Sequence, residues 1–351
     1  MVALGNVGIN MVQVKICLLT RYFDFRNAGI GRVSTEVMKG IVKNGYSVHA
    51  ISTNGDSLYS YFLYTLAGIP MKLPRQGIDV YHALTPMEAI WLPKDKSVVT
   101  FHDLFQITNP DKLGSGMGYS KWKNFVGTNY FAIACNVAKH CRFIVAVSEQ
   151  TKKDLIEYLN VPEEKISVIH SGIRPDLMPV HKWDKTFRIG YLGQLDRRKR
   201  INLLVEAFKG SSLEELVIGG TGVDGAMLKA QAGGDTRIKF LGRVPDNELV
   251  DFYNQLDVFM FPTWLEGYGL PPIEAMACKK PVVVLADARI PWEIKKRCVV
   301  TENLNMLLGN KGYLERLCKT IDIEGNYQFA KGHDWDKCVD KYLELYREIS
   351  G

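Results

Sequence analysis

The stretch from Asp257 to Leu285 limits most strongly what this chain can fold into. It begins with a short, aromatic-rich apolar run, Val258 to Phe261, which fits a buried parallel strand. A loop from Pro262 to Leu270 follows, and the prolines of residues 271–277 fit the first turn of a helix. Val282 to Leu285 is then expected to be the next strand. Such a unit places its loop at the carboxyl ends of the strands, where open α/β sheets bind ligands.

Two carboxylates bracket this loop. Glu266 lies on the loop itself, and Glu274 is expected in the first helical turn. Backbone N–H groups at a helix start suit a phosphate, and Gly267 and Gly269 let the backbone approach a ligand closely. A carboxylate accepts paired hydrogen bonds from vicinal hydroxyls, such as those of a ribose or a hexose. The pattern predicts a nucleotide-sugar site, although the helix dipole alone explains an acid near a helix start, and Gly-Tyr-Gly fits a turn.

The whole string resembles the Glu-x7-Glu signature of retaining glycosyltransferases of the GT-B fold, in its form Glu-Gly-Phe/Tyr-Gly-Leu-Pro-x-x-Glu-Ala-Met-Ala. By this resemblance the chain is identified as a family-4-type enzyme (glycosyl transferases group 1), nearest in pattern to mannosyl- and glucosyltransferases. The resemblance implies that the donor is bound by Glu266, Gly267, Tyr268, Gly269, Leu270 and Glu274.

The order of the remaining motifs predicts two domains. Strand–helix alternation fills residues 13–178 and starts again over residues 186–332, with a polar, proline-containing linker at residues 174–185 between them. Residues 335–350 resemble the final helix that crosses back to the first domain in GT-B enzymes. The expected fold is α/β: two Rossmann-like, doubly wound domains facing each other across a cleft, with the acceptor on the first domain and the donor on the second.

Composition narrows the class of protein. At 351 residues, with 46% hydrophobic and 23% charged residues, the chain suits two globular domains. Seven cysteines without a Cys-x-x-Cys pair indicate reduced thiols and a cytoplasmic location. A net charge of +6 suits an anionic small molecule or lipid headgroups but is too diffuse to indicate nucleic acid. Residues 1–12 are expected to be a disordered extension, with Met11 as an alternative start.

Two motifs of the first half are candidates for the cleft. Gly29 and Gly31 lie between a strand and a helix, where a phosphate could dock, although the pair also fits a tight turn. His102 and Asp103 follow the strand expected at residues 97–101. Read alone they form an ordinary polar turn; the resemblance implies that His102 is the cleft histidine that faces the donor sugar and that the two glycines lie near the donor phosphates.

The second half contains a run of four cations after Gly193, at residues 197–200. Cations at a helix start oppose the helix dipole, so this run is either a solvated charge cluster or a clamp for a diphosphate. It resembles the family's Gly-x-Leu-x-x-x-Lys phosphate motif, with Lys199 at the lysine. Arg198 is the candidate for the second cation, since Gln194 replaces an arginine found in many members. Gly220, after the next strand, resembles a donor-side loop.

A long helix expected at residues 117–141 interleaves basic and aromatic residues: Lys121, Trp122, Lys123, Phe125, Tyr130 and Phe131. This composition fits peripheral contact with a membrane surface, and equally a core helix whose lysines extend to solvent.

The resemblance implies an enzyme that transfers a hexose from a nucleoside-diphosphate sugar to an acceptor hydroxyl with retention of configuration. His102, Glu266 and Lys199 are the candidate catalytic residues. No metal and no cofactor are expected, because cations can stabilise the leaving diphosphate. The acceptor is a sugar or a lipid-linked sugar; donor base, sugar and oligomeric state stay open. A nucleotide-sugar epimerase, a sugar phosphorylase and a non-catalytic sugar-nucleotide-binding homologue are the alternatives.

Overall fold

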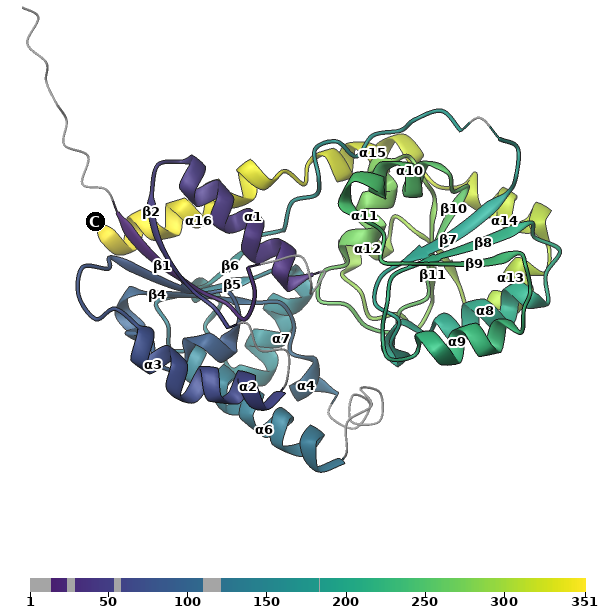
Figure 1. Cartoon of the computed structure of the whole chain (residues 1–351). Helices are drawn as coiled ribbons and strands as arrows, with labels where there is room; N and C mark the ends of the chain where they lie inside the picture. The colour runs from purple at the N-terminus through teal and green to yellow at the C-terminus, as the bar shows by residue number, and fades with distance from the viewer. Residues whose placement is uncertain (1–13, 24–28, 54–57, 110–120, 183) are drawn as a thin grey trace, which may run out of the picture.

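A computed structural model describes residues 14–23, 29–53, 58–109, 121–182 and 184–351. Two six-stranded parallel sheets stand side by side (Figure 1), with strand orders β2-β1-β3-β4-β5-β6 and β12-β11-β10-β7-β8-β9. Each sheet with the helices packed on it is called a lobe below. The expected fold class, α/β with two doubly wound domains, is confirmed.

The first lobe contains the strands β1 Lys15–Leu19, β2 Ser47–Ile51, β3 Val80–Ala83, β4 Ser97–Phe101, β5 Phe143–Ala146 and β6 Ile166–Val168. Its helices are α1 Ile30–Lys43, α2 Leu58–Leu63, α3 Ile69–Lys72, α4 Phe105–Thr108, α6 Lys121–Ala138 and α7 Glu149–Leu159, joined by the carboxy-terminal α16 Trp335–Ser350.

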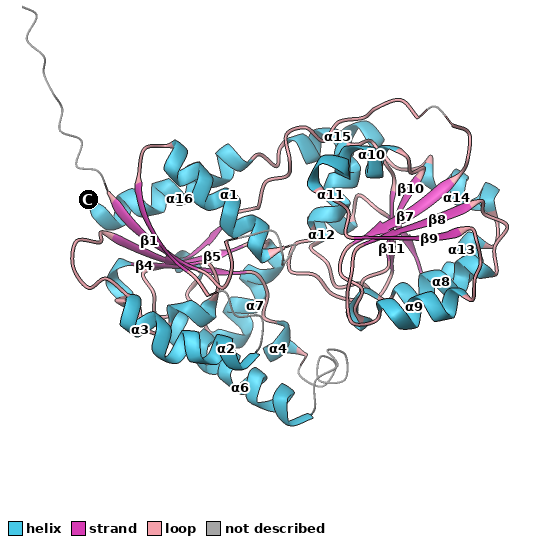
Figure 2. Ribbon diagram, viewed as in Figure 1, coloured by secondary structure: helices cyan, strands magenta, loops and turns pink. Residues whose placement is uncertain are grey.

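The second lobe contains the strands β7 Arg188–Leu192, β8 Glu215–Gly219, β9 Ile238–Gly242, β10 Val258–Phe261, β11 Val282–Leu285 and β12 Val299–Thr301. Its helices are α8 Ile201–Lys209, α9 Gly225–Ala232, α10 Leu249–Asn254, α11 Leu270–Ala277, α12 Trp292–Lys295, α13 Leu304–Leu308, α14 Lys311–Cys318 and α15 Ile323–Lys331. Figure 2 shows helices on both faces of each sheet.

Alternate residues of β1 in the first lobe serve two different cores, as a sheet covered on both faces requires. Ile16 and Leu18 pack with α1 and α16, whereas Cys17 and Leu19 pack in the cluster on the opposite face. All four side chains are fully buried. This two-sided burial explains why the strands are almost continuously apolar in sequence.

A buried polar network attaches α16 to the first sheet. His82 of β3 shares hydrogen bonds with the hydroxyls of Tyr346 (2.5 Å) and Thr100 (2.9 Å), and Tyr342 lies 3.2 Å from the same threonine oxygen. Burial lowers the pKa of His82 to about 3, so the ring is neutral and can donate from one nitrogen and accept at the other. These bonds give the end of the chain a specific position on the first lobe (Figure 1).

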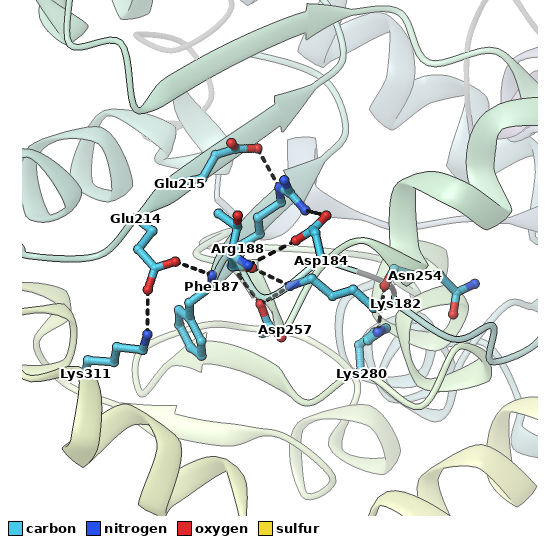
Figure 3. A network of polar contacts seen from close by, with 11 residues as sticks. Lys182, Asp184, Phe187, Arg188, Glu214, Glu215, Asn254, Asp257, Lys280 and Lys311 are labelled. Atoms are coloured by element: carbon cyan, nitrogen blue, oxygen red, sulfur yellow. Dashed lines mark hydrogen bonds and ion pairs between the residues drawn. The ribbon is translucent and has the colours of Figure 1, made fainter.

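The segment that enters the second lobe is held at the amino ends of its strands. Lys182 donates to Asp257 (2.5 Å), and Arg188 donates to both Asp184 (2.6 Å) and Glu215 (2.7 Å). Figure 3 shows these contacts together with the bond from the Phe187 N–H to Glu214. Because active sites of such sheets lie at the carboxyl ends, this charged network anchors the connection on the edge opposite the site.

In three segments the observed elements differ from the expected ones. The helix expected at residues 117–141 is α6, Lys121–Ala138, and residues 117–120 lie outside the described part, as does the extension 1–12. The sequence motifs assign no element to residues 52–96, and β3 lies there, in the middle of the first sheet. Glu274 is not in the first turn of its helix, because α11 begins at Leu270, before both prolines.

Candidate active site

The topology brings the predicted cationic motif, residues 197–200, close to the loop at residues 262–270, which is called the acidic loop below. In the second sheet the chain order reverses between β7 and β10, which are neighbours, and a crevice for ligands forms at such a reversal. The loop after β7 carries Lys199, and the loop after β10 carries Glu266. Two motifs that are 67 residues apart in the chain therefore face each other at the carboxyl edge.

Glu266 is the centre of a buried charge cluster. Its carboxylate is paired with Lys199 and lies 3.1 Å from Nη1 of Arg198, and it accepts a hydrogen bond from the Thr263 hydroxyl (2.9 Å). Burial by itself would raise the pKa of Glu266, but the charges of Arg198 and Lys199 outweigh it and hold the pKa at about 2. Burial also lowers the pKa of Lys199. The cluster thus holds two cations and one ionised carboxylate out of water.

Three of the four cations in the run divide between two tasks. Arg198 and Lys199 face Glu266, whereas Arg200 donates to the carbonyls of Pro262 (2.8 Å) and Thr263 (3.0 Å) and pairs with Asp287. Arg200 therefore holds the start of the acidic loop. These acidic and carbonyl partners offset the unfavourable placement of cations before α8.

The glycine loops after β7 and β8 are in direct contact. Gly193 and Gly220 both have positive φ (154° and 120°), and a Cβ on Gly220 would overlap the carbonyl oxygen of Gly193. The amide of Gly193 also donates to the Gly219 carbonyl (3.1 Å). Only glycine permits this approach, so the two predicted donor-side glycines allow the loops after β7 and β8 to pack backbone against backbone.

The acidic loop also touches the first lobe. Gly267 packs so closely against the backbone of His102 that a Cβ on it would overlap the His102 carbonyl oxygen. The hydroxyl of Ser148, which caps α7 by accepting from the Thr151 amide, donates across the gap to the Gly267 carbonyl (2.8 Å). The candidate site is therefore formed by both lobes, and Ser148 is a contact that the sequence motifs did not indicate.

His102 lies at the carboxyl end of β4 with a defined protonation state. Its Nε2 is 3.0 Å from the Leu84 carbonyl oxygen, which can only accept, so Nε2 carries the proton. Burial lowers the pKa of His102 to about 4, so Nδ1 is an unprotonated acceptor at neutral pH. Burial raises the pKa of the neighbouring Asp103, and the Phe105 N–H and the charge of Arg198 offset part of this rise.

Glu274, the second predicted carboxylate, is buried and already paired. Its Oε2 accepts from the Tyr253 hydroxyl (2.7 Å), and its Oε1 accepts from Arg32 of the first lobe (2.8 Å). Arg32 follows the predicted Gly29–Gly31 loop directly, and that position is the only sequence signal that could have indicated it. Gly29 is the N-cap of α1, and Gly31 is buried in its first turn.

Three further predicted donor residues lie at the start of α11. Gly269, with φ 101°, is its N-cap, and Leu270 is its first residue. The side chain of Tyr268 is directed elsewhere: its hydroxyl shares a hydrogen bond with His333, and its ring stacks on His170 at 5.1 Å. His170 lies between β6 and β7, where the chain leaves the first lobe, and His333 lies just before α16, where it returns. The ring of Tyr268 therefore connects the acidic loop to both segments that join the lobes.

The remaining predictions concern metal binding, membrane contact and location. Among the residues that the structure describes, no three side chains of His, Cys, Asp or Glu gather as a metal site. None of the helices in the described part combines the length and apolar character needed to span a membrane. Phe125 of α6 is 68% exposed, but the side chains of Lys121, Trp122 and Lys123 lie outside the description. Peripheral membrane contact and a cytoplasmic location stay predictions.

Comparison with known proteins agrees with this geometry. Residues 174–297 match the family described as "Glycosyl transferases group 1", and residues 42–177 match "Glycosyltransferase Family 4". The chain is 30% identical over 300 residues to the O-antigen chain mannosyltransferase RfbU of Salmonella typhimurium, covering 80% of this chain and 79% of that protein. The chain belongs to glycosyltransferase family 4.

Two further similarities extend over almost the whole enzyme. O-antigen chain mannosyltransferase B of Escherichia coli is 24% identical and covers 95% of the chain and 100% of its own length. The structure of HepE from Anabaena, solved in complex with UDP and glucose, superposes with a TM-score of 0.67 at 16% identity and covers 95% of this chain and 99% of its own. The fold is therefore GT-B, and the enzyme transfers a sugar from a nucleotide sugar.

Proposed function

We propose that this glycosyltransferase transfers a hexose, with mannose as the first sugar to test, from a nucleoside diphosphate to a hydroxyl of an acceptor sugar or lipid-linked sugar. The observation that carries the proposal is the cluster of Lys199, Arg198 and Glu266 opposite His102. Mannose is favoured by the relatives named above, both of which are mannosyltransferases. We assign the acceptor to the first lobe.

The cluster suits departure of a diphosphate. A buried lysine and a partly buried arginine stabilise negative charge more strongly than they would in bulk solvent. We assign Lys199 and Arg198 to the leaving diphosphate, together with the backbone at Gly193, Gly220 and the start of α11. Glu266 is assigned to the transferred hexose, whose hydroxyls its ionised carboxylate can accept.

His102 is assigned to a hexose hydroxyl. Because Nε2–H is directed to the Leu84 carbonyl, the available atom is Nδ1, which can accept a hydrogen bond from a hydroxyl but cannot donate one. The histidine is therefore a positioning and stabilising group in this proposal. The acceptor hydroxyl attacks the anomeric carbon on the face that the diphosphate leaves, its proton passes to a diphosphate oxygen, and configuration is retained.

Screening by thermal shift tests the proposed donor class. UDP, GDP and ADP, each with and without its glucose or mannose ester, are added at about 100 times the dissociation constant, where binding stabilises the folded state by about 2.7 kcal/mol. The active donor is then incubated with acceptor sugars, and the product anomer is determined by NMR. No stabilisation by any nucleotide, or an inverted product, would contradict the proposal.

The ribose assignment predicts a selective loss of affinity. Glu274→Ala should weaken binding of the nucleoside diphosphate by roughly 1–3 kcal/mol, because the ribose hydroxyls lose a charged acceptor. Isothermal titration against Glu324→Ala, which removes an exposed carboxylate on α15 of the same lobe, separates this effect from a change in net charge. Equal affinities for wild type and Glu274→Ala would remove Glu274 from the ribose.

The cation cluster also predicts activity without a divalent metal. Transfer should keep at least about half of its rate in excess EDTA, because Lys199 and Arg198 supply the positive charge that a metal otherwise supplies. The rate is measured with EDTA alone and after adding magnesium or manganese back. Activity that EDTA abolishes and a metal restores would show that the leaving group is stabilised differently.

A further inference from the structure

Arg32 makes the charged contact between the lobes that lies closest to the proposed ribose site. Its Nη1 is 2.8 Å from Oε1 of Glu274 on α11, and its Nη2 is 2.8 Å from Oδ1 of Asp246, which begins the turn before α10. Arg32 itself lies in the first turn of α1 in the first lobe. One guanidinium therefore bridges two carboxylates of the second lobe.

This bridge covers Glu274. With Arg32 in place, the side chain of Glu274 is only 4% exposed and that of Arg32 only 13% exposed. Both carboxylate oxygens are engaged, one by Arg32 and the other by Tyr253. A ribose diol needs close access to this carboxylate, and the contact with Arg32 occupies one of its two oxygens.

We propose that Arg32 is a gate over the ribose-binding carboxylate: it closes on Glu274 while the nucleotide site is empty, and the donor nucleotide binds by displacing it. The proposal rests on the assignment of Glu274 to the ribose. Both ligands of Glu274, a guanidinium and a vicinal diol, are hydrogen-bond donors, so one can replace the other without leaving the carboxylate unsatisfied.

The exchange connects nucleotide entry to the relative position of the lobes. Arg32 belongs to α1, whereas both its partners belong to the second lobe, so release from Glu274 removes a contact that holds α1 against α11. Arg174 of the connecting segment lies 3.7 Å from the second oxygen of Asp246 and supports that carboxylate from the other side. Asp246 can therefore keep a cationic neighbour when Arg32 moves.

The proposal predicts that removing Arg32 strengthens nucleotide binding. In isothermal titrations with UDP and with GDP, Arg32→Ala should bind the preferred nucleotide roughly tenfold more tightly than wild type, since a competing charge-assisted contact is lost. Asp246→Asn, which weakens the second anchor of Arg32 together with the longer contact of Arg174, should change affinity in the same direction by a smaller factor. The control Lys43→Ala removes an exposed cation of α1 that pairs with Asp336 of α16, and should bind as wild type does.

A double variant identifies the carboxylate involved. Arg32→Ala combined with Glu274→Ala should bind no more tightly than Glu274→Ala alone, because the gate then has nothing to cover. Unchanged or weaker binding by Arg32→Ala and Asp246→Asn, in protein whose melting temperature and circular dichroism match wild type, would overturn the gate. If only the Glu274→Ala effect is missing, the ribose assignment fails. If Glu274→Ala weakens binding and Arg32→Ala does not strengthen it, the gate alone fails.

Discussion

Replacing Glu266 by alanine is expected to lower the rate of sugar transfer by roughly a hundred- to a thousandfold, the range for losing one preorganised polar group at a reacting centre. The carboxylate is assigned to the hexose, so its loss acts on the reacting complex and not on the nucleotide. Affinity for the nucleoside diphosphate should be maintained or increased, because Lys199 and Arg198 lose the carboxylate that competes with the diphosphate for their charge.

The same substitution should also destabilise the empty enzyme. Glu266 and Lys199 are about one-tenth exposed, and breaking a buried pair by removing one partner costs roughly 3–5 kcal/mol. Saturating nucleoside diphosphate should restore much of that loss, since its phosphates replace the missing anion. Turnover, nucleotide affinity and melting temperature are measured together, with Glu324→Ala as the control. Weaker nucleotide binding at an unchanged transfer rate would place Glu266 on the nucleotide instead.

Gly267→Ala is expected to reduce the rate of sugar transfer by about a hundredfold. The expected cause is displacement of the acidic loop, since the substitution removes no reacting group. The added methyl group would overlap the backbone carbonyl of His102, so the acidic loop and the first lobe must move apart. A misplacement of about 1 Å in a reacting group costs on the order of a hundredfold in rate. The hydrogen bond from Ser148 to the Gly267 carbonyl should be lost in the same movement.

A matched glycine provides the control for this prediction. Gly225 begins α9 in the same lobe, and a Cβ on it would meet only Leu195 at an ordinary 3.7 Å, so Gly225→Ala should keep full activity. Kinetics is combined with small-angle scattering of the empty and nucleotide-bound forms. Full activity of Gly267→Ala with unchanged scattering would show that the close approach to His102 is not needed for transfer.

These contacts connect the chemistry to the arrangement of the lobes. Gly267 against His102 and Arg32 against Glu274 both join the first lobe to the acidic segment of the second. One contact lies beside each of the two signature carboxylates. A movement that separates the lobes would therefore change the surroundings of Glu266 and Glu274 together.

Much of the fold could be predicted because the signals are local. The strands 258–261, 282–285 and 97–101 have the expected bounds, since runs of buried apolar residues identify parallel strands without knowledge of their neighbours. The placement of Glu266 after one such strand, and of Lys199 after another, already predicted that both lie at the carboxyl edge of a sheet.

The elements that escaped prediction depend on contacts outside their own segment. The strand β3 has four residues and contains His82, a poor candidate for a buried strand until Tyr346 and Thr100 satisfy both ring nitrogens. The start of α11 was misplaced because Pro271 and Pro272 are tolerated throughout a first turn, and the positive φ of Gly269 moves that turn one residue earlier.

The parallel α/β class, the loops that carry the site and the residue types in those loops follow from the amino-acid sequence, because all of these depend on neighbours within a few positions. The partners of those residues depend on how the lobes pack. Arg32 and Glu274 are 242 positions apart, and Tyr268 and His333 are 65 apart. Partners at such distances are selected by the packing of two lobes and a returning helix, and no local propensity contains that information.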